Sequence, residues 1–242
     1  MSLSVHDADE CPPPPDAQRV ARRALILSAI VCRSNSDHDP TNFDAIDLWG
    51  RLKTWIESLD VAAEIEPAEK EMIYAPLGSL DNRKRIQAAW HAEGLGILAW
   101  ALGRFPLPKY DQKVDPYELT DSLAFLSEDA ADIIKSAELR PRAELNACRE
   151  LLYAIHCRLR QFFRDKQARS IAAWIEPQWL ETLGVESPLG ATGDLRIGNV
   201  EIAHAKNEDV RRYEEIVYER HRAAIWIVGE DGPLYSLVSV DT

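Results

Sequence analysis

The sequence predicts a mainly α-helical protein of the α+β class, folded as a single-domain bundle of several helices with a small C-terminal β-hairpin. Two observations support this fold class. Apolar residues recur at helical spacing through most of residues 17–228, a pattern typical of amphipathic and buried helices. Residues 195–202 carry a Gly-Asn pair at their centre, and such a pair is typical of a two-residue hairpin turn.

The chain is predicted to begin with a disordered Pro-rich tail, residues 1–16, because the four consecutive prolines at 12–15 form neither helix nor sheet. Residues 17–242 are predicted to form a single α-rich domain. At 242 residues with 46% hydrophobic residues, the chain is long enough to bury a substantial core.

The first three helices are expected at about residues 17–32, 44–59 and 67–74. Pro67 is favoured as the first residue of the third, because proline suits the opening turn of a helix. The expected buried side of the second helix consists of Ile46, Trp49, Leu52, Trp55, Ile56 and Leu59.

The longest apolar run, residues 86–105, predicts a central helix that is buried on both sides. Asp81 is expected to cap its start and Gly103 to end it. Gly94 and Gly96 each weaken a helix interior by about 1 kcal/mol, so we expect them to let another backbone come close. One stripe of this helix contains Ile86, Trp90, Glu93, Ile97 and Trp100.

Glu93 is the charge in this apolar stripe. A buried carboxylate must be paired, hydrogen-bonded or protonated, because an unpaired buried charge is very costly. We expect an arginine from another helix, with Arg22 or Arg23 as the first candidate. Two interpretations remain open. Glu93 is a general base or ligand anchor in a pocket walled by Trp90 and Trp100, or it is part of a buried ion pair that fixes the helix packing.

The stretch from Trp90 to Phe105 reads W-H-A-E-G-L-G-I-L-A-W-A-L-G-R-F, and P-L-P-K-Y-D follows it. It resembles the W-x-x-E-[AG]-L-x-x-L-x-W-A-L-G segment of the DUF4272 family, a bacterial domain family with no assigned function. Further segments that resemble the family are R-R-A-L-I-L-S-A-I from Arg22, L-W-G-R-L-K-T-W from Leu48, G-D-L-R-I-G-N-V-E-I from Gly193 and E-R-H-R-A-A-I-W-I-V-G from Glu219. The resemblance implies a shared fold and core, and it implies no activity.

The later helices are expected at about residues 116–126, 141–163 and 208–228, with residues 234–240 adding a short strand or lying against the hairpin. His221 lies on the apolar face of the last helix, where a core histidine is the usual interpretation and a pocket wall is the alternative. Arg222 is one turn from Trp226 and is expected to form a cation–π pair with it.

Several kinds of function are disfavoured. The net charge of −12 is a poor match for nucleic acid and for anionic membranes. The sequence also contains no run of about 18 uncharged apolar residues that could span a membrane. An anion or nucleic-acid surface through Arg149, Arg160 and Arg164 remains a minor hypothesis. The N-terminus has no apolar segment of a secretory signal. Few, scattered cysteines are typical of free thiols in the cytoplasm: Cys11, Cys32, Cys148 and Cys157.

The usual catalytic motifs are missing. The triplet from His91 to Glu93 matches the H-A-E of zinc cytidine deaminases, but the C-x-x-C that such a site requires does not occur. Asp37, His38 and Asp39 are adjacent in a loop and cannot all point at one metal ion. H-E-x-x-H, Walker A, G-x-G-x-x-G and G-x-S-x-G patterns do not occur. We therefore predict no metal and no cofactor.

These observations predict a cytoplasmic, non-catalytic protein that binds an unknown protein or small molecule. The alternative is an enzyme of unknown class with a pocket built around Glu93. The candidate residues for that buried polar site are Arg22, Arg23, Trp90, Glu93, Trp100, His221 and Arg222. An enzyme needs Glu93 to be reachable from solvent through a cavity, whereas a scaffold needs it to be sealed and paired.

Overall fold

The structure is a computed structural model that describes residues 13–37, 39, 41–230, 232 and 234–240. Within these residues it is mainly helical with one small sheet, so the predicted fold class is confirmed. Residues 1–12, which make up most of the predicted Pro-rich tail, lie outside the described residues, as does His38. The end of that tail is described: Pro15 is buried, and Pro14 lies against Gly229.

The elements follow the predicted order closely. The helices are α1 (Ala17–Ser36), α2 (Phe43–Ser58), α3 (Pro67–Tyr74), α4 (Asn82–Ala101), α5 (Pro116–Ser122), α6 (Ala130–Lys135), α7 (Arg142–Arg164), α8 (Pro177–Leu183) and α9 (Asn207–Val228). The hairpin pairs β1 (Arg196–Ile197) with β2 (Val200–Glu201) in antiparallel register. Gly198 takes the left-handed φ of +57° that this tight turn requires.

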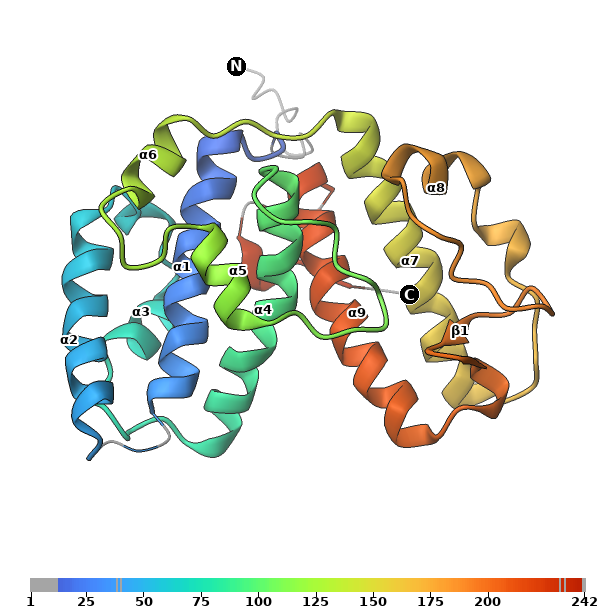
Figure 1. Cartoon of the computed structure of the whole chain (residues 1–242), viewed down its shortest axis with the longest axis horizontal. Coiled ribbons are helices and arrows are strands. Elements are labelled where there is room, and N and C mark those ends of the chain that lie inside the picture. The colour runs from blue at the N-terminus through green and yellow to red at the C-terminus, as the bar shows by residue number, and fades with distance from the viewer. Residues whose placement is uncertain (1–12, 38, 40, 231, 233, 241–242) are drawn as a thin grey trace, which may run out of the picture.

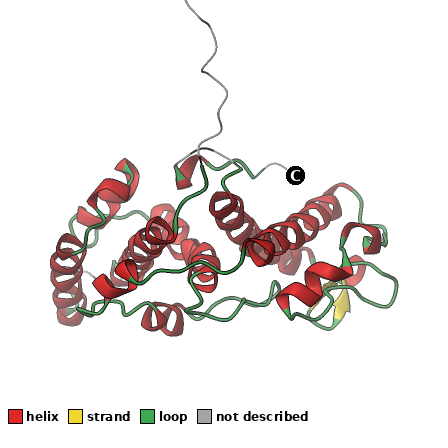
Figure 2. Ribbon diagram, turned by 90° about the horizontal axis from the view of Figure 1, so that it is seen from above, coloured by secondary structure: helices red, strands yellow, loops and turns green. Residues whose placement is uncertain are grey.

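The helices form two halves that α4 and α9 join (Figure 1). In one half, α1 packs against α2, α3, α4 and α6; in the other, α7 packs against α8 and α9. The hairpin lies at the end of the molecule opposite α2 (Figures 1 and 2). No helix in the described part of the chain is both long and apolar enough to cross a membrane.

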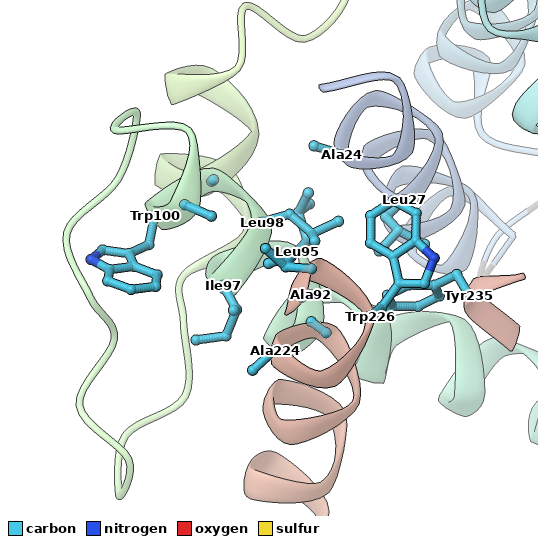
Figure 3. Close-up of a cluster of buried hydrophobic side chains, with 14 of the residues drawn as sticks. Ala24, Leu27, Ala92, Leu95, Ile97, Leu98, Trp100, Ala224, Trp226 and Tyr235 are labelled. Atoms are coloured by element: carbon cyan, nitrogen blue, oxygen red, sulfur yellow. The ribbon is translucent and has the colours of Figure 1, made fainter. Parts of the chain in front are cut away.

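The core is continuous across the contact between the two halves. Leu27 of α1, Leu95 and Leu98 of α4, and Ala224 and Trp226 of α9 are all buried in it (Figure 3). A helix that is apolar on more than one side must be covered on more than one side, and α4 is covered by α1 and by α9.

The ends and glycines of α4 match their predictions. The Asp81 carboxylate accepts a hydrogen bond from the Lys84 amide at 2.8 Å, and Gly103 ends the helix with a left-handed φ of +69°. At Gly94 the backbone carbonyl of Glu219 and the Tyr235 hydroxyl come close, and Pro108 and Val114 lie against Gly96. A side chain at either glycine would meet these neighbours.

Three expectations were wrong. Ile46 of α2 is exposed, because α2 lies at the edge of the bundle and buries only one narrow side. Ile86 at the start of the central stripe is 51% exposed, because α9 packs on α4 around Gly94 and diverges from it toward the N-terminal ends of both helices (Figure 1). Residues 234–240 contain no strand; Tyr235–Leu237 form a 3-10 turn whose tyrosine ring packs edge-on against Trp226.

Candidate functional site

Glu93 lies where α4 meets α9, and its partner is Arg220. Both side chains are buried, at 3% and 0% exposure. Arg220 donates two hydrogen bonds to one carboxylate oxygen of Glu93, from Nε at 3.0 Å and from Nη2 at 2.6 Å. The other oxygen accepts a hydrogen bond from the Val114 amide at 3.3 Å. The carboxylate is therefore paired, hydrogen-bonded and closed off from solvent.

The same guanidinium holds down the loop that follows α4. Arg220 donates to the backbone carbonyls of Lys109 and Gln112, each at 2.6 Å. Burial raises the pKa of Glu93 while Arg220 opposes that rise, and burial lowers the pKa of Arg220 while Glu93 opposes the fall. A buried guanidinium that satisfies one carboxylate and two carbonyls acts as a clamp on residues 109–112.

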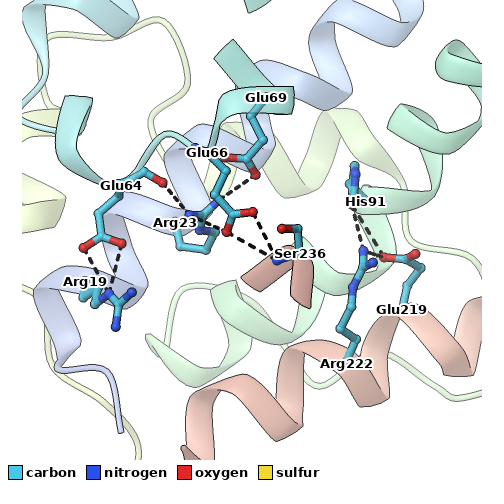
Figure 4. A network of polar contacts seen from close by, with 9 residues as sticks. All are labelled: Arg19, Arg23, Glu64, Glu66, Glu69, His91, Glu219, Arg222 and Ser236. Atoms are coloured by element: carbon cyan, nitrogen blue, oxygen red, sulfur yellow. Dashed lines mark hydrogen bonds and ion pairs between the residues drawn. The ribbon is translucent and has the colours of Figure 1, made fainter. Parts of the chain in front are cut away.

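The expectation that Arg22 or Arg23 meets Glu93 was wrong. Both arginines instead form their hydrogen bonds and ion pairs with residues 60–69. Arg22 contacts Asp60 at the surface, whereas the buried Arg23 pairs with Glu66 and Glu69 (Figure 4). The predicted helix α1 does pack against α4, but sequence spacing does not determine which neighbour each of its arginines faces.

Trp90 and Trp100 do not wall a pocket around Glu93. Trp100 is buried on the far side of α4 (Figure 3). The Arg140 guanidinium lies 5.3 Å from its ring centre. Trp90 is half-buried, with the Lys113 ammonium 4.0 Å from its ring centre. The two rings belong to separate environments, so the predicted Trp-walled pocket is not formed.

Arg222 belongs to a second buried polar cluster. It pairs with Glu219, and its Nη2 lies 3.1 Å from Nδ1 of His91 (Figure 4). Its guanidinium lies 5.0 Å from the ring centre of Tyr235, whereas Arg19 occupies the corresponding position over Trp226. The expected Arg222–Trp226 pair is therefore replaced by contacts to Tyr235 and Glu219.

His221 faces α7 and pairs with a second histidine. Its Nδ1 lies 3.3 Å from Nδ1 of His156, so one ring donates and the other accepts. Both rings are buried. Burial, then His156 and Arg149, lower the pKa of His221 to about 3. His221 is thus a neutral core histidine, and it does not lie beside Glu93 in a common site.

The low pKa of His221 predicts that the protein becomes less stable to unfolding in acid. Below an unfolded-state pKa of about 6.5, unfolded His221 binds a proton that the folded side chain refuses, so the free energy of unfolding falls as the pH falls. The loss is about 2 kcal/mol at pH 5. In His221→Gln, urea unfolding at pH 7 and pH 5 should show a pH-dependent loss smaller by about this amount. An unchanged loss would contradict the assignment of this pH dependence to His221.

A cleft lies next to the clamped loop. It has a volume of about 520 Å³ and is formed by α7 together with residues 107–112, 184–188 and 196–199; we call it the α7 cleft. Its floor is apolar and consists of Ile97, Cys148, Leu151, Leu152 and Ile155. Its polar lining residues include Lys109, Asp111, Gln112, Glu186, Arg196 and Asn199.

Two contacts tie the walls of the α7 cleft together. The Tyr110 hydroxyl donates to the backbone carbonyl of Arg196, and the Gly198 amide donates to the Asp111 carboxylate at 3.1 Å. Residues 107–112 are thus held by Arg220 on one side and by the hairpin on the other. The cleft is a preformed space with fixed walls.

Family comparison links this architecture to known sequences. The sequence profile of DUF4272, described as a domain of unknown function, matches residues 2–173. The chain belongs to the DUF4272 family. No curated protein and no solved structure matches this chain. The DUF4272 match includes Glu93 and, from the α7 cleft, residues 107–112 and α7 itself. It ends before Arg220 and the hairpin. The family-like segments from Gly193 and Glu219 lie beyond it.

Sequence reasoning missed Arg220 and the α7 cleft, although one signal for Arg220 was available. Arg220 shares a helix face with Val217 and Ala224, both of which are buried, so it was a second charge in an apolar stripe. The cleft had no comparable signal, because its walls come from segments far apart in the chain.

Proposed function

We propose that this DUF4272 protein is a non-catalytic binding protein that holds a small molecule in the α7 cleft. A volume of about 520 Å³ is within the usual range for small-molecule sites. An apolar floor with several polar groups at the walls is also the usual composition of such sites. Leu151 and Leu152 would contact the apolar body of the ligand, and Lys109 and Arg196 would bind its polar groups.

The observation that carries this proposal is the clamp beside the cleft. The buried Arg220 is paired with Glu93, and it also donates hydrogen bonds to backbone carbonyls within residues 108–112. A wall that is fixed before binding lowers the entropic cost of holding a ligand. Free thiols at Cys32, Cys148 and Cys157 support the accompanying proposal that the protein works in the cytoplasm.

The alternative, an enzyme built around Glu93, has less support. Both carboxylate oxygens of Glu93 are engaged, and Glu93 does not line the α7 cleft. A general base must reach the proton that it abstracts. Glu93 therefore contributes to the proposed function indirectly, by holding Arg220 in place.

Binding is tested by screening a library of soluble metabolites for compounds that raise the melting temperature. Ser187→Trp places a large side chain at an exposed position of the cleft lining, and Glu118→Trp is the matched control on α5, outside the cleft. We expect a ligand at about 100 times its Kd to stabilise the wild type and the control by about 2.7 kcal/mol, but not Ser187→Trp. Equal stabilisation of all three proteins, or of none, would reject the proposal.

A further inference from the structure

The apolar stripe of α4 continues past the point where α9 covers it. Ile86 is 51% exposed and Trp90 is half-buried, and across from them Tyr218 of α9 is 37% exposed. Large apolar side chains exposed singly are common, but several in one hollow mark a binding surface. These three line a groove of about 610 Å³ between residues 82–90 of α4 and 214–219 of α9, which we call the α4–α9 groove.

The divergence of the two helices creates this groove. Around Gly94 the missing side chain lets α9 approach closely, with the Glu219 carbonyl and the Ala223 methyl group beside it. From there toward their N-terminal ends the helices separate (Figure 1). The lower part of the α4 stripe therefore keeps its apolar character without a helix of this chain packed over it. The groove shares no lining residue with the α7 cleft.

The charges along the groove are mainly negative. Glu214 and Glu215 line it from α9, and among its described lining residues Arg83 supplies the positive charge. Glu215 is exposed, and no ion pair to it is formed within the described residues. Glu214 lies 3.5 Å from Nε2 of His156. Glu219, which also lines the groove, is neutralised by Arg222.

We propose that the α4–α9 groove docks an amphipathic helix of a partner protein, with lysine or arginine residues flanking the apolar face of that helix. An apolar floor beside the carboxylates of Glu214 and Glu215 is complementary to such a helix, and helix-in-groove binding is a common mode of recognition. The net charge of −12 favours the approach of a cationic partner. Residues 82–90 span about 12 Å at 1.5 Å per residue, which corresponds to about two turns of the bound helix.

The test uses the full-length protein and a fluorescent peptide of about 18 residues, roughly five helical turns, with leucine on one face and lysine on the other. A peptide of the same design with glutamate in place of lysine is the charge control. Binding is measured by fluorescence anisotropy at low ionic strength and at about 0.15 M. We expect saturable binding of the lysine peptide, weaker at the higher ionic strength, and at least about tenfold weaker binding of the glutamate peptide.

Variants locate the binding. Ile86→Ser should weaken binding of the lysine peptide about tenfold or more, and Glu214→Gln combined with Glu215→Gln should weaken it about tenfold at low ionic strength. The control combines Tyr117→Ser with Glu118→Gln on α5, where Tyr117 is also highly exposed, and should bind within about twofold of the wild type. Circular dichroism checks that each variant is folded. Absence of saturable binding, equal binding of both peptides, or groove variants that bind like the wild type would each overturn the proposal.

Discussion

Replacement of Glu93 by glutamine is expected to lower the free energy of unfolding by roughly 3–5 kcal/mol, because it leaves the Arg220 charge buried without a counter-charge. Both partners are almost fully buried, so water cannot solvate the guanidinium in place of the carboxylate. The measurement is urea unfolding of the wild type and of Glu93→Gln, followed by circular dichroism, at neutral pH.

The surface pair Arg22–Asp60 supplies the control for this experiment. The Asp60 side chain is 93% exposed, so Asp60→Asn should leave the unfolding midpoint almost unchanged, as is usual for surface ion pairs. If Glu93→Gln were as stable as Asp60→Asn, Glu93 would not be a structural ion-pair member. A variant more stable than the wild type would instead point to a functional carboxylate held at the expense of stability.

A chain that ends after residue 173, where the DUF4272 match ends, is expected not to fold. It lacks α9, which packs against both α4 and α7. Glu93 would lose Arg220, and the buried Arg158 would lose Asp194, whose carboxylate accepts its Nε at 2.6 Å. We expect the truncated chain to aggregate or to show no cooperative thermal transition by circular dichroism, whereas the full chain melts cooperatively.

A cooperative melt of the truncated chain, with a monomer on gel filtration, would contradict this expectation. It would mean that residues 1–173 are an independent domain and that α9 is an addition to a complete core. The full-length protein under the same conditions is the control.

Local patterns predicted the elements of the fold well. Asp81 and Gly103 mark the ends of α4 because a helix leaves backbone groups unpaired at both ends. The hairpin was found from Gly198-Asn199, since few dipeptides suit a two-residue turn. The observed α3, Pro67–Tyr74, has the predicted bounds because proline fixes the start of the helix.

The pairing of residues far apart could not be predicted in the same way. Because Glu93 lies in the apolar stripe of α4, a partner was expected for its buried charge. That partner is an arginine of another helix, as predicted. Several arginines met that requirement, and only the packing of α9 on α4 selects Arg220. Periodicity also places Ile86 and Ile97 on the same face, although Ile86 is exposed and Ile97 is buried. The spacing of apolar residues carries no information about the angle at which two helices cross.

Hydrogen exchange of residues 107–114 in the wild type and in Glu93→Gln tests most directly whether the Glu93–Arg220 pair holds the wall of the α7 cleft. Within this segment, Arg220 donates hydrogen bonds to two backbone carbonyls, and the Val114 amide donates one to Glu93. We predict that the amides of residues 107–114 exchange at least about tenfold faster in the variant, and that this increase exceeds the increase in α2, which is remote from the pair (Figure 1) and reports the general loss of stability. Equal exchange of residues 107–114 in the two proteins would contradict the account.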